Sequence, residues 1–485
     1  MAGKYKTPGV YVEEISTIPP SVAQVETAIP AFIGYTEKAE KDGQDLVGKP
    51  TRISSLTEYE AYFGKVDPLL SNGSITEPKI SVTVEMDDDG TATAIRKIIP
   101  KLDDNSTIFR MYYGLKLFFD NGGGPCYIVS SGTTNGSLDI GNARDDFIGA
   151  LNKLKYEDEP TLILFPDAHL IISDEFYYGL YDNALIQCAS LKDRFTIIDV
   201  KKPETASDDP IEVMRGEPLT NLKYGAVYYP DLKTHYGYIY DDTMVTVNES
   251  IYDTTTGSTS TNAAVTLDQI DSMELSDFEY NAIKAEIRRV LRVVMPPGCA
   301  MAGIYARVDR ERGVWKAPAN VTVSSVIEPV VKISDEEQKS MNVDTNAGKS
   351  VNAIRSFRGK GVLVWGARTL AGNDNEWRYV SVRRFFNMVE ESVKKSSSWV
   401  VFEPNDANTW TRVKAMIENY LITLWRNGAL AGAKPEEAFF VKVGLGETMT
   451  SLDILEGRMN IEIGMAVVRP AEFIILKFSH KLQES

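Results

Sequence analysis

The chain has 485 residues, of which 43% are hydrophobic and 25% are charged. This composition excludes wholesale disorder, and the length exceeds what one hydrophobic core supports, so we expect roughly two to four domains. No run approaches the roughly 18 apolar residues of a membrane helix, and no apolar segment of a signal peptide follows the N-terminus. We therefore expect a protein that is made in a cytoplasm and is not inserted in a membrane.

The formal charge of -16 is unevenly distributed along the chain. Residues 331–485 carry a net charge of +2, whereas residues 1–330 carry -18. Acidic surface opposes binding to nucleic acid, so we expect no nucleic-acid partner. All six tryptophans lie beyond residue 314, and Trp and Arg are enriched in protein interfaces. The second part of the chain is the expected place of subunit contacts, although these tryptophans can also fill one domain's core.

Each end of the chain carries one isolated extended segment. Residues 9–15 alternate in side-chain direction and are followed by Pro19 and Pro20, and residues 472–481 follow Pro470. A single strand cannot satisfy its own backbone, so each segment must join a sheet edge, in its own chain or in another. The candidate arm residues are Val10, Tyr11, Val12, Ile15, Phe473, Ile475 and Phe478.

Between these arms the pattern alternates between strands and helices, which predicts an α/β layer. The expected strands are 126–130, 161–166, 194–200 and 226–232, and the expected helices are 57–63, 111–120, 175–192 and 278–294. Residues 75–99 instead predict an inserted β-hairpin about the turn at 87–90. Residues 248–263, rich in Ser, Thr and Gly, predict an exposed loop.

The last third of the chain predicts two long helices, 377–395 and 410–427. The second has an apolar stripe at helical spacing, which either packs on its own domain's sheet or faces a partner. Two short strands are then expected, at 438–444 and 459–468.

Motifs for catalysis or cofactor binding are weak. Residues 347–350 read A-G-K-S, but Val343 stands where a phosphate-binding loop needs glycine. Asp87–Asp89 lacks the spacing of a calcium loop, and the three cysteines have no metal-ligand or disulfide pattern. We therefore expect no catalytic residue, cofactor or metal. An α/β enzyme whose site is assembled from distant residues is the alternative.

A polar segment at 307–316, which we expect to be a loop, interleaves four basic and two acidic residues around Trp315. Alternating charge fixes register at polar interfaces, so this segment predicts a subunit contact, with a solvated loop as the alternative. The candidate residues for a subunit or tube contact are Arg310, Arg312, Trp315, Arg383, Arg384, Lys394 and Lys395.

Seven runs together resemble the contractile tail sheath family of phage tails and extracellular injection machines. In chain order they cover residues 8–15, 27–36, 300–320, 359–370, 376–384, 399–405 and 469–474. Their order and combined length make chance a poor explanation. Residues 68–106 and 201–276 carry little of the resemblance and are expected to be variable in the family.

The resemblance implies a mixed α+β and α/β fold with several domains. We expect an N-terminal arm at 1–25 and an outer and middle α/β domain at 26–330, which contains the hairpin insertion at about 68–106 and the variable region at 201–276. An inner, tube-proximal domain at 331–470 and a C-terminal arm at 471–485 complete the expected chain.

The resemblance also implies a structural function, in which copies polymerise as six-subunit rings around an inner tube and contract to drive it into a target. The implied partners are the chain itself, the tube protein, baseplate and cap proteins, and related sheath proteins, assembled in a bacterial cytoplasm and released as a particle. Family arms add to sheets of neighbouring subunits, and the candidate acceptor residues here are Phe440, Val441, Val443, Ile461 and Ile463. A baseplate or cap protein with a sheath-like fold is a further alternative.

Overall fold

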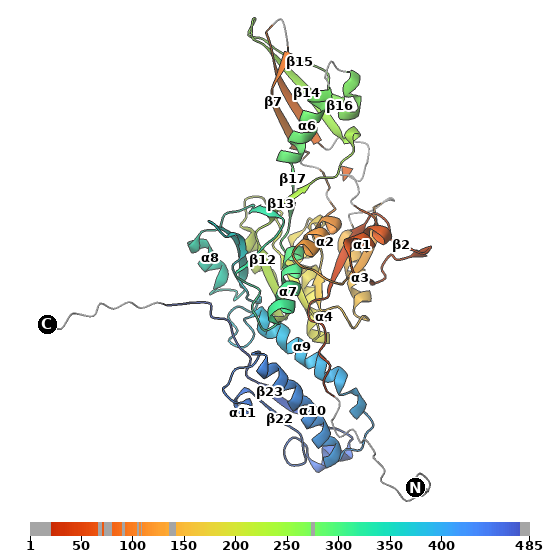
Figure 1. Ribbon diagram of the computed structural model, residues 1–485, viewed down its shortest axis with the longest axis vertical. Helices are drawn as coiled ribbons and strands as arrows, with labels where there is room; N and C mark the ends of the chain where they lie inside the picture. Colours follow the sequence, from red (N-terminus) through yellow and green to blue (C-terminus); the bar gives the residue numbers. More distant parts are fainter. Residues whose placement is uncertain are drawn as a thin grey trace, which may run out of the picture. The chain divides into compact units, whose positions relative to one another are not determined.

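The computed structural model describes residues 21–65, 70–71, 80–89, 93–103, 106–107, 109–134, 142–272 and 277–475 (Figure 1). The described residues form two compact units, a larger one within 26–387 and 469–475 and a smaller one of residues 21–25 and 388–468. Residues 331–387 lie in the larger unit, because β20 (Val351–Phe357) pairs with β12 (Gly225–Tyr229) in its main sheet. No described helix is long and apolar enough to cross a membrane.

The larger unit is built on a nine-stranded sheet in the order β18-β21-β20-β12-β11-β10-β1-β9-β4. Strands β20 through β9 in that order are parallel, and β4, β18 and β21 are antiparallel to their neighbours. The further bounds are β1 (Pro30–Thr36), β4 (Thr51–Ile53), β9 (Cys126–Thr133), β10 (Leu162–Leu164), β11 (Phe195–Asp199), β18 (Val321–Thr322) and β21 (Gly361–Val364). Every residue of β1 and β11 is buried, which is why these strands are mostly apolar and lack an alternating polar face.

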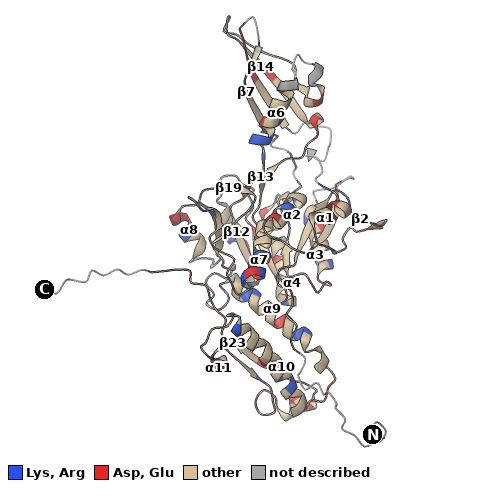
Figure 2. Cartoon of the chain, viewed as in Figure 1, with Lys and Arg blue, Asp and Glu red and all other residues tan. Residues whose placement is uncertain are grey.

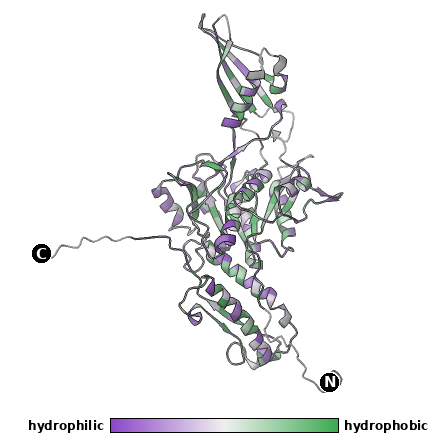
Figure 3. Cartoon of the chain, viewed as in Figure 1, coloured by the Kyte–Doolittle hydropathy of each residue, from purple (hydrophilic) through white to green (hydrophobic). Residues whose placement is uncertain are grey.

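Helices cover both faces of this sheet and create two hydrophobic clusters. In β1, Phe32 packs in one cluster with α2 and α7, whereas Ile33 packs in the other with α3 and α4. The helices of the larger unit are α1 (Leu56–Phe63), α2 (Met111–Asp120), α3 (Ala143–Leu154), α4 (Asp174–Leu191), α5 (Pro210–Gly216), α6 (Asp277–Val290), α7 (Gly298–Arg312) and α8 (Asp335–Asn342). Helix α8 is hydrophilic and buries only Met341 (Figure 3). Because helices cover both faces of a largely parallel sheet, the predicted α/β layer is confirmed.

The inserted hairpin and residues 245–266 of the variable region form one five-stranded sheet. The strands β6 (Ile80–Asp88) and β7 (Thr93–Leu102) pair as the predicted hairpin, and β14 (Val245–Asp253) joins β6 in parallel. Both β15 (Thr259–Thr261) and β16 (Val265–Thr266) pair with β14, β7 is the opposite edge, and α6 packs on this sheet. The exposed loop expected at 248–263 is wrong for residues 248–253, because they belong to β14 and complete the hairpin's sheet. Residues 254–263 are exposed as expected, and they form a turn and the short strand β15.

Two other expectations for the larger unit are corrected. The helix expected to reach residue 294 ends at Val290, because β17 (Arg292–Met295) pairs with β13 (Leu232–Gly237), which also pairs with β19 (Val326–Pro329). The polar segment that begins at Arg307 is helical as far as Arg312, at the end of α7. The remaining strands are β2 (Glu40–Lys41), β3 (Gln44–Asp45), β5 (Leu70–Ser71) and β8 (Ser106–Thr107).

The smaller unit contains the second half of α9 (Val380–Ser396), which begins in the larger unit, and α10 (Ala407–Arg426). The predicted stripe of α10 is buried at Val413, Ile417, Tyr420, Leu421 and Leu424. Its other elements are α11 (Pro435–Ala438), β22 (Phe439–Lys442), α12 (Ser451–Leu455) and β23 (Glu462–Met465). Strands β22 and β23 form an antiparallel pair, so the two strands predicted in this region exist.

Candidate arm anchors and subunit contacts

The outer parts of both predicted arms lie outside the described residues. These parts include Val10, Tyr11, Val12, Ile15 and Phe478. The start of the described chain, at residues 21–25, lies in the smaller unit along the end of α9. There the Ala23 N–H donates to Ser396 Oγ at 3.1 Å and the Val25 N–H donates to Ser392 Oγ at 3.0 Å. The N-terminal segment is thus tied by its backbone to one helix before it enters the larger unit.

The described part of the C-terminal arm is apolar and exposed. Phe473, Ile474 and Ile475 are 70%, 80% and 79% exposed, and they belong to no strand of the described chain. Three consecutive large apolar residues are typical of a buried strand, but here their side chains are exposed to water. They fit the expected addition to another chain, which stays a prediction.

Immediately before this exposed run, Glu472 is firmly held within the larger unit. Arg368 donates to it from Nε, at 3.0 Å to Oε1 and 3.2 Å to Oε2, and from Nη2 at 2.6 Å to Oε2. The Asn342 amide donates to Oε1 at 2.9 Å, and the Tyr379 hydroxyl donates to Oε2 at 3.3 Å. Burial by itself would raise the pKa of Glu472, but the hydrogen bonds from Arg368 and Asn342 outweigh it and the pKa is lowered.

The N-terminal segment has a comparable attachment where it enters the larger unit. Arg384 Nη2 lies 2.5 Å from Asp309 Oδ2 and donates to the Thr27 carbonyl at 2.8 Å. The Thr27 hydroxyl donates to Asp309 Oδ2 at 2.6 Å, and the guanidinium of Arg384 lies 4.5 Å from the ring centroid of Tyr305. A buried ion pair between α9 and α7 therefore holds this segment by both its backbone and its side chain.

These contacts change the candidate surface for subunits or tube. Arg383 and Arg384 are only 2% and 4% exposed, and the Cζ atom of Arg383 lies 4.2 Å from the ring centroid of Trp377. A side chain that its own chain buries has no surface for a partner, so both leave the candidate set. Figure 2 shows charges of both signs along α9. The candidates that keep accessible surface are Arg310, Arg312, Lys394 and Lys395, with Trp315 half-buried against Phe385.

The expected acceptor strands are present in the smaller unit. Among its described residues β22 and β23 pair only with each other, so each strand has one edge without a backbone partner. Val441 lies opposite Ile463 in this pair. Val441 and Val443 are buried, Ile461 and Ile463 are half-buried, and Phe440 is exposed. Two open edges are the geometry that strand addition requires.

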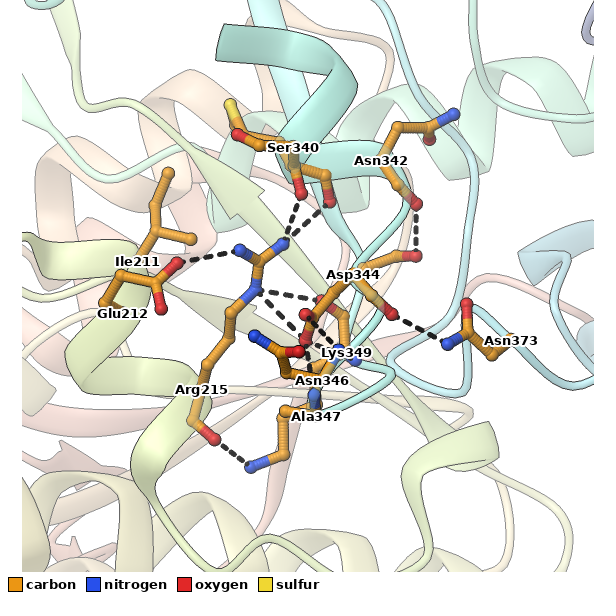
Figure 4. A network of polar contacts seen from close by, with 12 residues as sticks. Ile211, Glu212, Arg215, Ser340, Asn342, Asp344, Asn346, Ala347, Lys349 and Asn373 are labelled. Atoms are coloured by element: carbon orange, nitrogen blue, oxygen red, sulfur yellow. Dashed lines mark hydrogen bonds and ion pairs between the residues drawn. The ribbon is translucent and has the colours of Figure 1, made fainter.

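The A-G-K-S segment is a structural network and not a phosphate site (Figure 4). The Asp344 carboxylate accepts the N–H groups of Asn346 and Ala347 at 3.0 Å each and of Lys349 at 3.3 Å, so it occupies the position of an anion. The Lys349 ammonium donates to the carbonyls of Arg215, at 2.8 Å, and Glu217. The network joins α5 to the loop before β20, and burial lowers the pKa of Lys349.

A cavity of about 590 Å³ lies at the carboxyl ends of β10 and β11, where open α/β sheets commonly bind ligands. Its lining includes Asp199, Asp231, Arg110 and His169. Burial raises the pKa of Asp199 to about 7, and the N–H of Gly298, at the start of α7, donates to it at 2.7 Å. Asp199 is therefore accounted for as a helix cap. In the described part of the chain no group of three or more His, Cys, Asp or Glu side chains is placed to hold a metal ion.

Two sequence-family profiles match the chain. The family described as "Phage tail sheath protein central domain" matches residues 192–370, and "Phage tail sheath C-terminal domain" matches residues 372–481. The tail sheath protein of Enterobacteria phage T4 is 26% identical over 127 residues, which are 26% of this chain and 19% of that protein. The tail sheath protein of Burkholderia phage BcepMu is 28% identical over 144 residues, which are 29% of this chain and 30% of that protein. The matches thus span less than a third of these curated relatives.

Solved structures resemble the chain over nearly its whole length. The helical sheath of the anti-feeding prophage in its contracted state has a TM-score of 0.62 and 30% identity, and the match covers 98% of this chain and 100% of that one. The PVC sheath complex of an extracellular contractile injection system, also contracted, has a TM-score of 0.62 and 29% identity over 99% of each chain. A chain of the anti-feeding prophage baseplate matches with a TM-score of 0.62 and 30% identity, covering 99% of this chain and 100% of that one. With these full-length matches and two family profiles over more than half of its residues, the chain belongs to the phage tail sheath family.

Proposed function

We propose that the chain is the structural subunit of a contractile sheath, which polymerises as six-fold rings around an inner tube. The observation that carries this proposal is that one chain has both an exposed apolar arm and strand edges without a backbone partner. Phe473, Ile474 and Ile475 face water directly after Glu472, and within the described residues β22 and β23 each have one edge without a backbone partner. Strand addition between copies satisfies both surfaces at once.

Contraction is then a mechanical two-state change. Sheath assembled on its tube and baseplate is held in an extended state, and a trigger at the baseplate lets each ring rotate into better-packed contacts. Free-energy differences of a few kcal/mol per subunit suffice because many subunits act in series. The arms keep the copies linked while their folded units slide. The subunit itself needs no catalysis, since the free energy is stored in the interfaces.

The partners follow from this arrangement. They are further copies of the chain, the inner tube protein, baseplate and cap proteins, and related sheath proteins in the same particle. Arg310, Arg312, Trp315, Lys394 and Lys395 are the candidate contacts with a neighbouring subunit or the tube. Assembly takes place in the bacterial cytoplasm, and the particle is released afterwards.

The test is expression of the full chain and of a chain lacking residues 1–20, with each examined by negative-stain electron microscopy and sedimentation. We expect hollow cylinders from the full chain and folded monomers from the deletion. Normal cylinders from the deletion would contradict the arm mechanism. Single rings from the full chain would favour a baseplate or cap protein. The similarity to a chain of the anti-feeding prophage baseplate supports this alternative. A small oligomer that turns over a ligand in the cavity beside Asp199 would favour an α/β enzyme.

A further inference from the structure

The C-terminal arm changes from held to exposed within one residue. Glu472 is half-buried and accepts hydrogen bonds from Arg368, Asn342 and Tyr379, whereas Phe473, the next residue, is 70% exposed. Just upstream, Arg469 Nη1 donates to the Asn375 carbonyl at 2.8 Å. All these residues belong to the larger unit. The last fixed point of the described arm is therefore Glu472.

Arg368 is itself fixed from several sides, and it is 3% exposed. Besides holding Glu472, its Nη1 donates to the carbonyls of Asn342 at 3.1 Å and Gly372 at 3.4 Å. Because all three guanidinium nitrogens donate hydrogen bonds, the side chain of Arg368 is fixed in one orientation. The Glu472 carboxylate accepts hydrogen bonds at both oxygens, so its orientation is fixed as well. Lysine has no planar fork and cannot reproduce this geometry.

A continuous path of hydrogen bonds links this ion pair to the main sheet. The backbone N–H of Arg368 donates to Asn352 Oδ1 at 2.7 Å, and Asn352 Nδ2 donates back to the Arg368 carbonyl at 2.8 Å. The same Nδ2 donates to the Val227 carbonyl at 3.0 Å. Asn352 lies in β20 and Val227 in β12. Hydrogen bonds between buried groups therefore connect Glu472 to two central strands of the sheet.

We infer that Arg368 is the positioning residue of the C-terminal arm. It fixes the arm's base on the nine-stranded sheet, so that the hinge for strand addition to a second copy of this chain begins at Phe473. The inference rests on the proposed function for its second copy, but the anchoring itself is a property of one chain. Both residues of the pair lie in runs that carry the family resemblance, 359–370 and 469–474.

The anchoring is tested in the full chain, kept dilute so that it stays unassembled. Chymotryptic cleavage after Phe473 is followed by mass spectrometry in wild type, Glu472→Gln and Arg368→Lys. Hydrogen bonds to charged groups contribute enough for us to expect cleavage about 10- to 100-fold faster in Glu472→Gln. The matched control is Asp335→Asn, which removes an equal charge from the Arg355–Asp335 pair (2.7 Å) in the same unit without contact to the arm. Control cleavage should equal that of wild type.

The positioning role is tested by the concentration at which sheaths form, measured by sedimentation. We expect Glu472→Gln to need at least about tenfold more protein than wild type or Asp335→Asn. Equal cleavage rates in Glu472→Gln and wild type would overturn the anchoring. Faster cleavage with unchanged assembly would overturn the positioning role. Should wild type itself form no polymer, the proposed function fails, and the cleavage ratio still decides whether Arg368 anchors the arm. If Arg368→Lys does not fold, Glu472→Gln alone decides both points.

Discussion

Phe402 combines two features that do not serve the stability of its own chain. It is fully exposed, at 103% of the reference area, and its φ angle of 70° lies in the left-handed region. For residues with a Cβ this region is about 1–2 kcal/mol less favourable than the right-handed one. An exposed ring on a strained backbone is the pattern of a residue kept for contact with another molecule. We therefore predict that removal of the ring weakens assembly without destabilising the folded chain.

The substitution pair Phe402→Gly and Phe402→Ala separates the two effects. Glycine adopts positive φ freely, but it gains about 0.5–1 kcal/mol of backbone freedom in the unfolded chain, so the net stabilisation is about 0–1.5 kcal/mol, centred on about 0.75 kcal/mol. Alanine keeps the strain, and since the exposed ring is not buried in the chain, Phe402→Ala should unfold like wild type. The measurement is equilibrium unfolding of the unassembled chain in guanidinium chloride, compared at equal slope.

Assembly should be weakened, and to the same extent, in both variants. Burying a Phe side chain contributes about 1.5–3 kcal/mol, which is about 10- to 150-fold in the protein concentration needed to form sheaths. Equal stability of the glycine and alanine variants would refute the argument from backbone strain. Wild-type assembly by Phe402→Ala would refute the argument from contact, whatever the unfolding data show.

Three further predictions concern buried groups. Burial raises the pKa of Asp199 to about 7, despite hydrogen bonding from Gly298, so the folded chain holds a proton that the unfolded chain releases from about pH 4. Its contribution to stability is therefore present at low pH and lost as pH rises to 7. Asp199→Asn should unfold near wild type at pH 4.5 and be more stable at pH 8, by up to about 4 kcal/mol; an equal difference at both pH values would contradict this. Asp344→Ala should destabilise the larger unit by about 3–5 kcal/mol, because it leaves three backbone N–H groups without their acceptor and removes the carboxylate that lies 3.5 Å from Nε of the buried Arg215, and calorimetry of the full chain measures it. Burial raises the pKa of all three cysteine thiols, so a thiol reagent should label them only as fast as the chain unfolds, and rapid labelling under native conditions would argue against the packing.

Local chemistry made several elements predictable from sequence. Helix α2 runs from Met111 to Asp120 as predicted, since an apolar stripe forms it and Gly122, with φ of 98°, follows its end. The apolar stripe of α10 and the strands β22 and β23 were also predicted, from helical periodicity and β-propensity, whereas the burial of the stripe and the pairing of the two strands were not. The family resemblance, carried by short runs along the chain, is confirmed by the profiles and the solved sheath structures. These features depend on residues that are close in sequence.

What remained hidden depends on residues far apart. The hairpin β6–β7 could be predicted from its alternating residues and turn, whereas the pairing of Val245 in β14 with Ile80 in β6 is visible only in the folded chain. Arg383 and Arg384 read as surface charges, and only folding places Arg384 against Asp309 in another helix. Arg368 and Glu472 are 104 residues apart, so no local pattern announces their ion pair. Secondary structure and the arms' apolar pattern follow from short-range rules, whereas the burial of a charge depends on which distant group arrives to neutralise it.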